Sequence, residues 1–455
     1  MDVRLVPPHI APPRRAPVGP AFVAKFVGNP LQVIPQAVYE QDFVTYRSGK
    51  RGLVWITAPA FIKAVLLDER EKFRKLAQIR VLGPLLGKGI LTSEGADWKW
   101  QRQTAAPLFR QQDLTSFVPN FVRTAEDIVA RWSAAPQGAV QAIERDMTHA
   151  TFRVISTTLL PMADAQVMDA IEHSTANFQK TGAWSQLYAL AKLPRWLPQP
   201  RQRANRHAVL ALRAAVGRLL RERRASGLEP HDLMQSLMRA RDPDTEKSMN
   251  DEQLIDNLLT FYLAGHETTA KALTWTLYLL ARSPHWTAAL KDEIARVTGG
   301  ATISAANIDR LVLVQQVIKE SMRLYPPVPL MTRQAVAEAQ LGPHPIPAGT
   351  SVAMSIYAIH RHRARWSDPD AFDPERFAPA KEAQIPRYHY MPFGAGPRIC
   401  IGMAFAMLEA TAMLAILLQR ARFAPLEGHE PLPVARVTLV PRGGMPLRVW
   451  TDASR

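Results

Sequence analysis

The stretch Phe393-Gly-Ala-Gly-Pro-Arg-Ile-Cys400-Ile-Gly402 decides how the rest of this chain is interpreted, because Cys400 is the only cysteine among 455 residues. The glycines around it let the backbone turn tightly and let a flat group approach it closely. The following segment, 401–422, has the apolar periodicity of a helix. We therefore expect Cys400 to open a helix, where the positive end of the helix dipole favours a thiolate.

A lone cysteine is most often a small buried hydrophobic residue, and that is the alternative interpretation here. Zinc and iron–sulfur sites need several ligands, and the sequence offers neither a second cysteine nor a nearby ligand cluster. A single thiolate can instead be the axial ligand of a haem. Arg398, two residues before Cys400, supplies a fixed cation suited to hold a carboxylate.

The pattern Phe-x-x-Gly-x-Arg-x-Cys-x-Gly resembles the haem-binding loop of the cytochrome P450 haem-thiolate monooxygenases. The matching positions are Phe393, Gly396, Arg398, Cys400 and Gly402. The resemblance implies that Cys400 is the proximal ligand of haem b (iron protoporphyrin IX) and that the other four residues bind the cofactor. It also implies a mainly α fold, with a large helical domain, a smaller β-rich region, and haem buried between a long central helix and the cysteine loop.

The longest helical signal begins at Asn250-Asp-Glu-Gln253, which predicts a capping box, and ends before Ser283-Pro284. At ~1.5 Å per residue, such a helix is ~48 Å long and crosses the whole molecule. Within it, Gly265 and two threonines disfavour the helix, and threonine hydroxyls can bond to the preceding turn. We therefore expect a locally loosened helix there.

The run Ala264-Gly265-His266-Glu267-Thr268 starts like a zinc-protease motif, but the second histidine of that motif is missing. It resembles instead the oxygen-activation groove of the same family. This resemblance implies that Ala264 and Gly265 contact the haem, while Thr268 and Glu267 deliver protons to dioxygen. The alternative is that Thr268 and Glu267 only pack or cap the loosened turn.

Two further places match the cofactor site of the family. Trp98 and Arg102 are four residues apart on one helical face, where they could form an ordinary aromatic–cation contact. They resemble the Trp-x-x-x-Arg element that holds one haem propionate. Arg333 matches a position from which family members reach the second propionate.

Glu320 and Arg323 are spaced like an ordinary helical ion pair. Together with Arg376 in the run Pro-Glu-Arg-Phe, they resemble the buried Glu–Arg–Arg cluster that braces the core behind the haem loop. We interpret these three residues as structural.

The chain is basic, with 56 Lys and Arg against 40 Asp and Glu. A basic balance fits nucleic acid, a membrane surface or an acidic protein partner, and it also fits charges spread over a solvated surface. No nucleic-acid-binding module is visible, so we expect no nucleic acid partner. Nine arginines lie between residues 195 and 224, which predicts a solvated helix face or a surface that meets a membrane or partner. In the family this region forms the lid over the substrate.

We expect one catalytic domain over residues 1–455, with a proline-rich lead-in at 1–30. The lead-in has no long apolar run, and one cysteine fits a reducing compartment. We therefore expect a soluble, cytoplasmic protein of the bacterial type without a transmembrane anchor. Residues 43–57 predict a β-hairpin. The glycine-rich segment 83–89 has the wrong spacing for a phosphate loop, so that interpretation is rejected.

The resemblance implies a monooxygenase that uses dioxygen to hydroxylate or epoxidise a lipophilic small molecule such as a fatty acid, a terpenoid or an aromatic compound. Electrons would come from NAD(P)H through a separate ferredoxin or flavodoxin and its reductase. The alternatives are a peroxide-driven haem-thiolate enzyme and a haem-binding sensor without turnover. The sensor would need the Cys400 loop but not Glu267 and Thr268.

Overall fold

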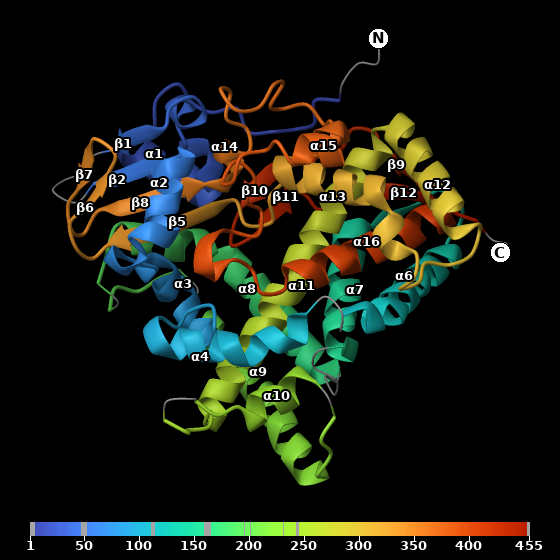
Figure 1. Ribbon diagram of the computed structural model, residues 1–455, viewed down its shortest axis with the longest axis horizontal. Coiled ribbons are helices and arrows are strands. Elements are labelled where there is room, and N and C mark those ends of the chain that lie inside the picture. Colours follow the sequence, from blue (N-terminus) through green and yellow to red (C-terminus); the bar gives the residue numbers. More distant parts are fainter. Residues whose placement is uncertain are drawn as a thin grey trace.

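The computed structural model describes residues 5–46, 52–110, 114–158, 165–194, 196–200, 202–230, 232–242 and 245–452. Helices dominate it and gather around the long helix α11 (Figure 1). The helices are α1 Gly19–Gly28, α2 Pro59–Lys63, α3 Leu76–Leu86, α4 Gly95–Ala105, α6 Val118–Ser133, α7 Ile143–Thr158, α8 Ala165–Leu190, α9 Gln202–Ser226, α10 Leu233–Arg239, α11 Asp251–Ala281, α12 Pro284–Thr298, α13 Val312–Leu324, α14 Ile356–Ile359, α15 Pro379–Glu382 and α16 Met403–Arg420.

The strands form small sheets, and β1, β2, β8 and β5 lie together at one side of the molecule (Figure 1). The largest sheet has the order β1-β2-β8-β5-β3, and the others have the orders β4-β12-β9, β10-β11 and β6-β7. The strands are β1 Phe43–Tyr46, β2 Leu53–Ile56, β3 Phe73–Arg74, β4 Ala139–Ala142, β5 Leu330–Ala335, β6 Ala339–Leu341, β7 His344–Ile346, β8 Ser351–Ser355, β9 Ala421–Pro425, β10 Pro433–Ala435, β11 Leu439–Pro441 and β12 Pro446–Thr451.

The predicted hairpin is confirmed in its strands, because β1 and β2 pair antiparallel with Val44 opposite Trp55. Its turn, residues 47–51, lies outside the described residues. On its other edge β2 runs parallel to β8, and β8 pairs antiparallel with β5.

The central helix α11 begins as predicted. The Asn250 side chain accepts a hydrogen bond from the Gln253 backbone N–H at 2.9 Å, and the Gln253 side chain accepts one from the Asn250 N–H at 3.0 Å. The helix ends at Ala281, ahead of Pro284. Most of its side chains are buried, as expected for a helix packed on all sides.

The expected loosening of α11 is not found, since the helix is α-helical from Asp251 to Ala281. The hydroxyls of Thr268 and Thr269 do bond back to the carbonyls four residues earlier, at 2.8 and 3.3 Å. Gly265 serves close packing instead, because a Cβ atom there would lie 2.7 Å from the Ile155 side chain on α7.

The glycine-rich segment 83–89 ends α3 and packs tightly onto α11. A Cβ atom at Gly87 would lie 2.1 Å from the Asp256 carboxylate, and one at Gly89 would lie 2.3 Å from the Thr260 hydroxyl. The Lys88 backbone N–H donates to Asp256 Oδ2 at 2.7 Å. The glycines therefore let this loop approach the central helix, and they form no phosphate site.

The arginine-rich helix α9 is only partly a solvated surface. Arg223 is buried and pairs with Asp232 at 2.8 Å, and Arg213 pairs with the buried Asp256 of α11 at 2.7 Å. These two arginines attach α9 to the elements that follow it, so the prediction of a solvated face is wrong for them.

The proline-rich lead-in packs against residues near the other end of the chain. Tyr325 Oη donates to the Pro8 carbonyl at 2.7 Å, and the Ile10 N–H donates to Tyr357 Oη at 3.2 Å. The Phe372 N–H donates to the Leu5 carbonyl at 2.9 Å. Residues 5–10 are thus part of the fold.

Helix α16 follows the Cys400 loop into the core. In the part of the chain that the structure describes, it is the one helix with the length and apolar composition of a membrane span. Its residues 409–418 are all buried against other parts of the protein. Packing in the core accounts for its apolar composition.

Candidate active site

The loop that precedes α16 holds the cysteine in a defined position. The Cys400 backbone N–H donates to the Phe393 carbonyl at 2.9 Å and closes the loop. Gly396 has φ +71°, and a Cβ atom there would lie 2.6 Å from the Leu66 carbonyl oxygen, so a side chain does not fit. At Gly402 a Cβ atom would lie 4.0 Å from the cysteine sulfur. Of the predicted loop residues, Phe393 and Gly402 thus lie beside Cys400.

The expectation that Cys400 opens the helix is wrong, because α16 begins at Met403. Burial raises the pKa of the Cys400 thiol above its usual 9.0, while the Gly402 N–H and the Arg102 guanidinium oppose this in part. The helix dipole therefore does not by itself produce a thiolate. A coordinated metal ion deprotonates a thiol outright, so the raised pKa is compatible with ligation.

Two small side chains, Cys400 and Ala264, are more exposed than the residues around them. Cys400 is exposed although protein atoms bury its neighbourhood enough to raise the pKa of the thiol. Ala264 is exposed on α11, whose other residues are mostly buried, and the half-buried Thr268 lies one turn further along the same face. Helix α11 packs against α16, the helix that follows the cysteine (Figure 1).

A group of cations lies beside the cysteine loop. The Arg398 guanidinium sits 4.1 Å from the centre of the Trp98 ring and donates to the Ser93 carbonyl at 2.8 Å. Arg102, on α4 with Trp98, donates to the Ile399 carbonyl at 2.8 Å. The aromatic–cation contact of Trp98 is thus made with Arg398.

Arg333 on β5 belongs to the same group. It is buried and donates to the Thr332 carbonyl at 2.8 Å and to the Gln78 side chain at 3.3 Å. Burial and the nearby Arg398 lower the pKa of Arg333 to about 10. The pKa of Arg398 is also lowered to about 10, first by burial and then by neighbouring cations.

Lys75 completes this group, and sequence reasoning missed it because it belongs to no motif. It is buried, and its ammonium donates to the Leu91 carbonyl at 2.5 Å. Burial, then Arg398 and Arg333, lower the pKa of Lys75 to about 7. We call Lys75, Arg102, Arg333 and Arg398 the cation cluster.

The Glu94 carboxylate raises the pKa values of Lys75, Arg333 and Arg398 against these effects, and Glu71 adds to its effect on Arg398. Glu94 also pairs with Arg74 at 3.3 Å. The positive charge of the cation cluster therefore exceeds the negative charge that the protein places beside it.

The two residues predicted to deliver protons have different surroundings. The Thr268 hydroxyl donates to Ala264 on its own helix. Glu267 is buried, and its Oε1 accepts a hydrogen bond from the Thr438 hydroxyl at 2.8 Å. Thr438 lies in the turn between β10 and β11, and no sequence motif pointed to it.

The cysteine loop ahead of a core helix and the acid–alcohol pair on the central helix can be compared with known proteins. A family model described as "Cytochrome P450" matches residues 12–445. This chain belongs to the cytochrome P450 family. The family confirms the mainly α fold with small sheets, and it uses haem and dioxygen with electrons derived from NAD(P)H.

Named cytochrome P450 relatives cover nearly the whole chain. It is 32% identical over 417 residues to cyclooctatin synthase of Streptomyces melanosporofaciens, covering 90% of this chain and 89% of the relative. It is 31% identical over 401 residues to cyclooctat-9-en-7-ol 5-monooxygenase of the same organism, with 88% and 86% covered. It is 32% identical over 437 residues to a cytokinin hydroxylase of Arabidopsis thaliana, with 91% and 83% covered.

This cytochrome P450 is therefore an oxidoreductase of the monooxygenase class. Its relatives come from a bacterium and from a plant at nearly the same identity. The expectation of a bacterial type accordingly stays a prediction.

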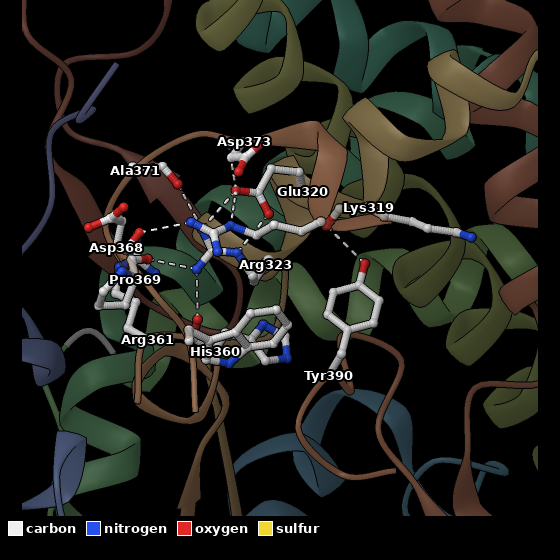
Figure 2. A network of polar contacts seen from close by, with 12 residues as sticks. Lys319, Glu320, Arg323, His360, Arg361, Asp368, Pro369, Ala371, Asp373 and Tyr390 are labelled. Atoms are coloured by element: carbon white, nitrogen blue, oxygen red, sulfur yellow. Dashed lines mark hydrogen bonds and ion pairs between the residues drawn. The ribbon is translucent and has the colours of Figure 1, made fainter. Parts of the chain in front are cut away.

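The predicted Glu–Arg–Arg cluster of this cytochrome P450 is confirmed, and Figure 2 shows its Glu320–Arg323 pair. Arg323 donates to both carboxylate oxygens of Glu320 at 2.6 and 2.7 Å, and neither side chain is accessible. Arg376 lies 3.5 Å from the same carboxylate. Arg323 also donates to the backbone carbonyls of His360, Pro369 and Ala371. This cluster, which we call the brace, ties α13 to the segment before the cysteine loop.

A cavity of about 560 Å³ lies between the cysteine loop, α13 and α16. Its lining is largely apolar and includes Phe393, Met403 and Met407. One ion pair, Lys319–Glu382 at 2.7 Å, contributes to the lining. The wall of this cavity next to the cysteine loop thus carries both apolar and charged side chains.

Proposed function

We propose that this cytochrome P450 binds haem b between α11 and the Cys400 loop, with Cys400 as the proximal ligand. The observation that carries the proposal is the joint exposure of Cys400, in a mostly half-buried loop, and Ala264, on a mostly buried helix. A flat ligand between these elements would cover both side chains. Within the described ranges, no three His, Cys, Asp or Glu side chains come together as a metal site, so the thiolate would be the protein's contribution to the iron.

The cation cluster fits the two carboxylates of haem b. Cations crowded in a buried place repel each other and lower one another's pKa, and a dianion brought among them reverses both effects. Arg102 and Arg398, with Trp98, would hold one propionate, and Arg333 with Lys75 would hold the other. Phe393, Gly396 and Gly402 would shape the backbone around the sulfur.

Haem held by a thiolate supplies the activation of dioxygen for insertion into a C–H or C=C bond. The small, exposed Ala264 side chain on α11 would leave room for the cofactor, and the Thr268 hydroxyl lies one helical turn further along the same face. Glu267 would relay protons from solvent toward that hydroxyl. A general acid–base pair of this kind contributes to a rate only while both members keep their positions.

The test of ligation is spectroscopic. The protein purified with haem should, when reduced and bound to carbon monoxide, absorb at the long-wavelength position typical of thiolate ligation. Cys400→His should move this band to shorter wavelength, and Cys400→Ser should lose it. A short-wavelength band from the correctly folded parent protein would contradict the proposal.

The electron donor we propose is a separate acidic ferredoxin or flavodoxin with its reductase, docking near the Cys400 loop. The support is the excess of basic residues in the chain. Exposed charges are screened beyond ~8 Å at physiological salt, so donor affinity should fall as salt rises. Turnover with NAD(P)H alone, or donor affinity indifferent to salt, would contradict this part.

The substrate we propose is a lipophilic small molecule, with terpenoids ahead of fatty acids and aromatics. Two relatives carry names that refer to cyclooctatin and cyclooctat-9-en-7-ol, and this is the support for the order. A panel of the three classes should be screened for the spectral shift on binding, followed by turnover under labelled dioxygen. One labelled oxygen atom per product marks a monooxygenase, whereas product formed from peroxide alone marks the peroxide-driven alternative.

We also propose that the whole chain acts as one catalytic domain in the cytoplasm. The family model spans nearly all of it, and a single cysteine suits a reducing compartment. Limited proteolysis should give one resistant core, and fractionation of the producing cells should recover the protein without detergent.

A further inference from the structure

The carboxylate of Glu267 is held by an element outside its own helix. Thr438 Oγ1 donates to Glu267 Oε1 at 2.8 Å, and both residues are buried. Thr268, by contrast, bonds within α11 to Ala264. A movement of the β10–β11 turn would therefore shift the Glu267 carboxylate and leave the Thr268 hydroxyl in place.

One end of the β10–β11 hairpin is fixed to the core. The Leu439 N–H donates to the Pro327 carbonyl at 2.9 Å, and the Trp275 indole on α11 donates to the Leu439 carbonyl at 3.1 Å. Trp275 is completely buried. The hairpin is thus anchored on α11 only one residue beyond Thr438.

The tip of the same hairpin is joined to α8. The Gln186 side chain on α8 donates to the Arg436 carbonyl at 2.9 Å, and the Arg436 N–H donates to the Thr438 carbonyl at 2.9 Å. A Cβ atom at Gly182 of α8 would touch Val437 at 3.6 Å. Displacement of α8 would therefore be transmitted to the turn that carries Thr438.

We propose that Thr438 is a positioning residue that holds the Glu267 carboxylate in its buried orientation, and that α8 controls its release through Gln186 and the β10–β11 turn. The proposal rests on the proposed function, in which Glu267 relays protons. The carboxylate must leave Thr438 to exchange a proton with solvent. Closure of α8 on a substrate would then decide when the relay operates.

The proposal predicts how a variant without the hydroxyl behaves. Thr438→Val keeps the shape of the side chain and removes the donor, so Glu267 Oε1 loses the hydrogen bond that orients it. Electrons and protons would then combine with dioxygen to form hydrogen peroxide, in place of one oxygen atom in the product and one in water. We expect the amount of hydrogen peroxide formed per NAD(P)H oxidised to rise about fivefold. This factor corresponds to the free energy of one lost hydrogen bond.

Thr438→Ser is the matched control, because it keeps the hydroxyl and removes only a methyl group. It should form as much product per NAD(P)H oxidised as the parent protein does. A purely structural role for Thr438 would lower the melting temperature of Thr438→Val and leave its coupling unchanged, and this result would overturn the proposal. Equal uncoupling in the Ser and Val variants would overturn it too, since the methyl group would then be the cause.

Gln186→Met tests the link to α8 and leaves the Thr438–Glu267 bond intact, so it decides the matter even if Thr438→Val does not fold. With substrate bound, this variant should form more hydrogen peroxide than the parent protein, while the rate of haem reduction stays unchanged. Parent-like coupling in this variant would overturn the control by α8.

Crystal structures of the parent protein and Thr438→Val provide a readout that does not depend on turnover. The Glu267 side chain should change rotamer in the variant, and an unchanged rotamer would overturn the positioning role. The parent's own turnover is measured first. A parent protein that forms no product refutes the proposed function, whereas a productive parent with unaffected variants refutes only this inference.

Discussion

The brace and the cation cluster are both groups of buried charges, yet they differ in how those charges are balanced. In the brace, the Arg323 guanidinium meets a carboxylate at two points, and backbone carbonyls take its remaining donors. In the cation cluster, three of the four cations share the Glu94 carboxylate, which itself pairs with Arg74, and Arg398 is also near a second one, Glu71.

The comparison teaches that a buried charge can either stabilise the fold or bind a ligand. Which of the two it does depends on whether groups of opposite charge within the protein already balance it. Buried ions are costly unless they are paired and hydrogen-bonded. In a complete network, partners within the protein offset that cost. In an incomplete one, the cost is offset only when an anion binds. The two groups should therefore respond in opposite ways when one cation is removed.

The largest effect is expected for Arg323→Ala in the brace. The change leaves the Glu320 carboxylate buried without its bidentate partner, and breaking such a pair costs about 3–5 kcal/mol of stability. Chemical denaturation with haem bound measures it. Lys319→Gln is the control on the same helix, and a partly exposed pair of this kind is worth only about 0–1 kcal/mol. Equal losses in the two variants would remove the distinction between brace and surface pair.

Arg398→Met should weaken haem binding and leave the fold intact. The variant keeps much of the aliphatic stem against Trp98 but loses a charged donor, worth about 1.5–3 kcal/mol, or roughly 10–100-fold in haem affinity. Titration of the haem-free protein with haem measures the affinity, and denaturation of the same sample measures stability. A loss of stability as large as that of Arg323→Ala would mean that Arg398 also braces the fold.

Lys75 should take up a proton when haem binds. Its pKa is lowered to about 7 by burial and by Arg398 and Arg333, and two propionates nearby would raise it again. Between pH 7 and the ordinary value of 10.5, the amine gains a proton on binding. Calorimetry in two buffers of different ionisation enthalpy measures this uptake, and Lys75→Met should lack it. If the parent protein and Lys75→Met take up the same number of protons, Lys75 is not the group that is protonated when haem binds.

Glu409 on α16 is a third case, a buried acid for which no nearby cation acts on the pKa, and its effect depends on pH. Neither of its oxygens makes a regular hydrogen bond, and the nearby Thr269 hydroxyl donates to Gly265 instead. Burial raises the pKa of Glu409 well above its ordinary 4.5, so the folded protein holds a proton that the unfolded chain releases.

It follows that the stability contribution of Glu409 is complete below pH 4.5 and is lost as the pH rises toward its folded pKa. Glu409→Gln should gain on the parent protein by at most about 1.4 kcal/mol per pH unit over that interval. Melting temperatures of both proteins against pH measure this. Parallel curves would show that the carboxyl group is ionised or solvated in the folded state.

The sequence predicted the features that lie close together along the chain. The capping box at Asn250, the Cys400 loop and the Glu320–Arg323 pair each span a few residues, and local spacing determines their geometry. The start of α16 was placed too early, because apolar periodicity does not determine the exact residue at which a helix begins, and the structure puts it at Met403.

Contacts between distant segments could not be predicted in this way. Lys75 joins the cation cluster only because α3, α4 and β5 fold together, and no motif contains it. Thr438 lies 171 positions from Glu267, and nothing in the spacing of either residue indicates the bond. The loosened helix at Gly265 was wrong for the same reason, since the glycine makes room for Ile155 of another helix.

The contacts of residues 5–10 have a consequence for how the chain folds as it is made. These residues are synthesised well before their partners Tyr325, Tyr357 and Phe372, which follow 317 to 367 positions later. Contacts of such long separation are slow to form, because the entropy of closing the loop is lost before they stabilise anything. The lead-in must therefore wait, unpaired, through most of translation. Its final docking is a late step that also joins the beginning of the chain to the segment beside the brace.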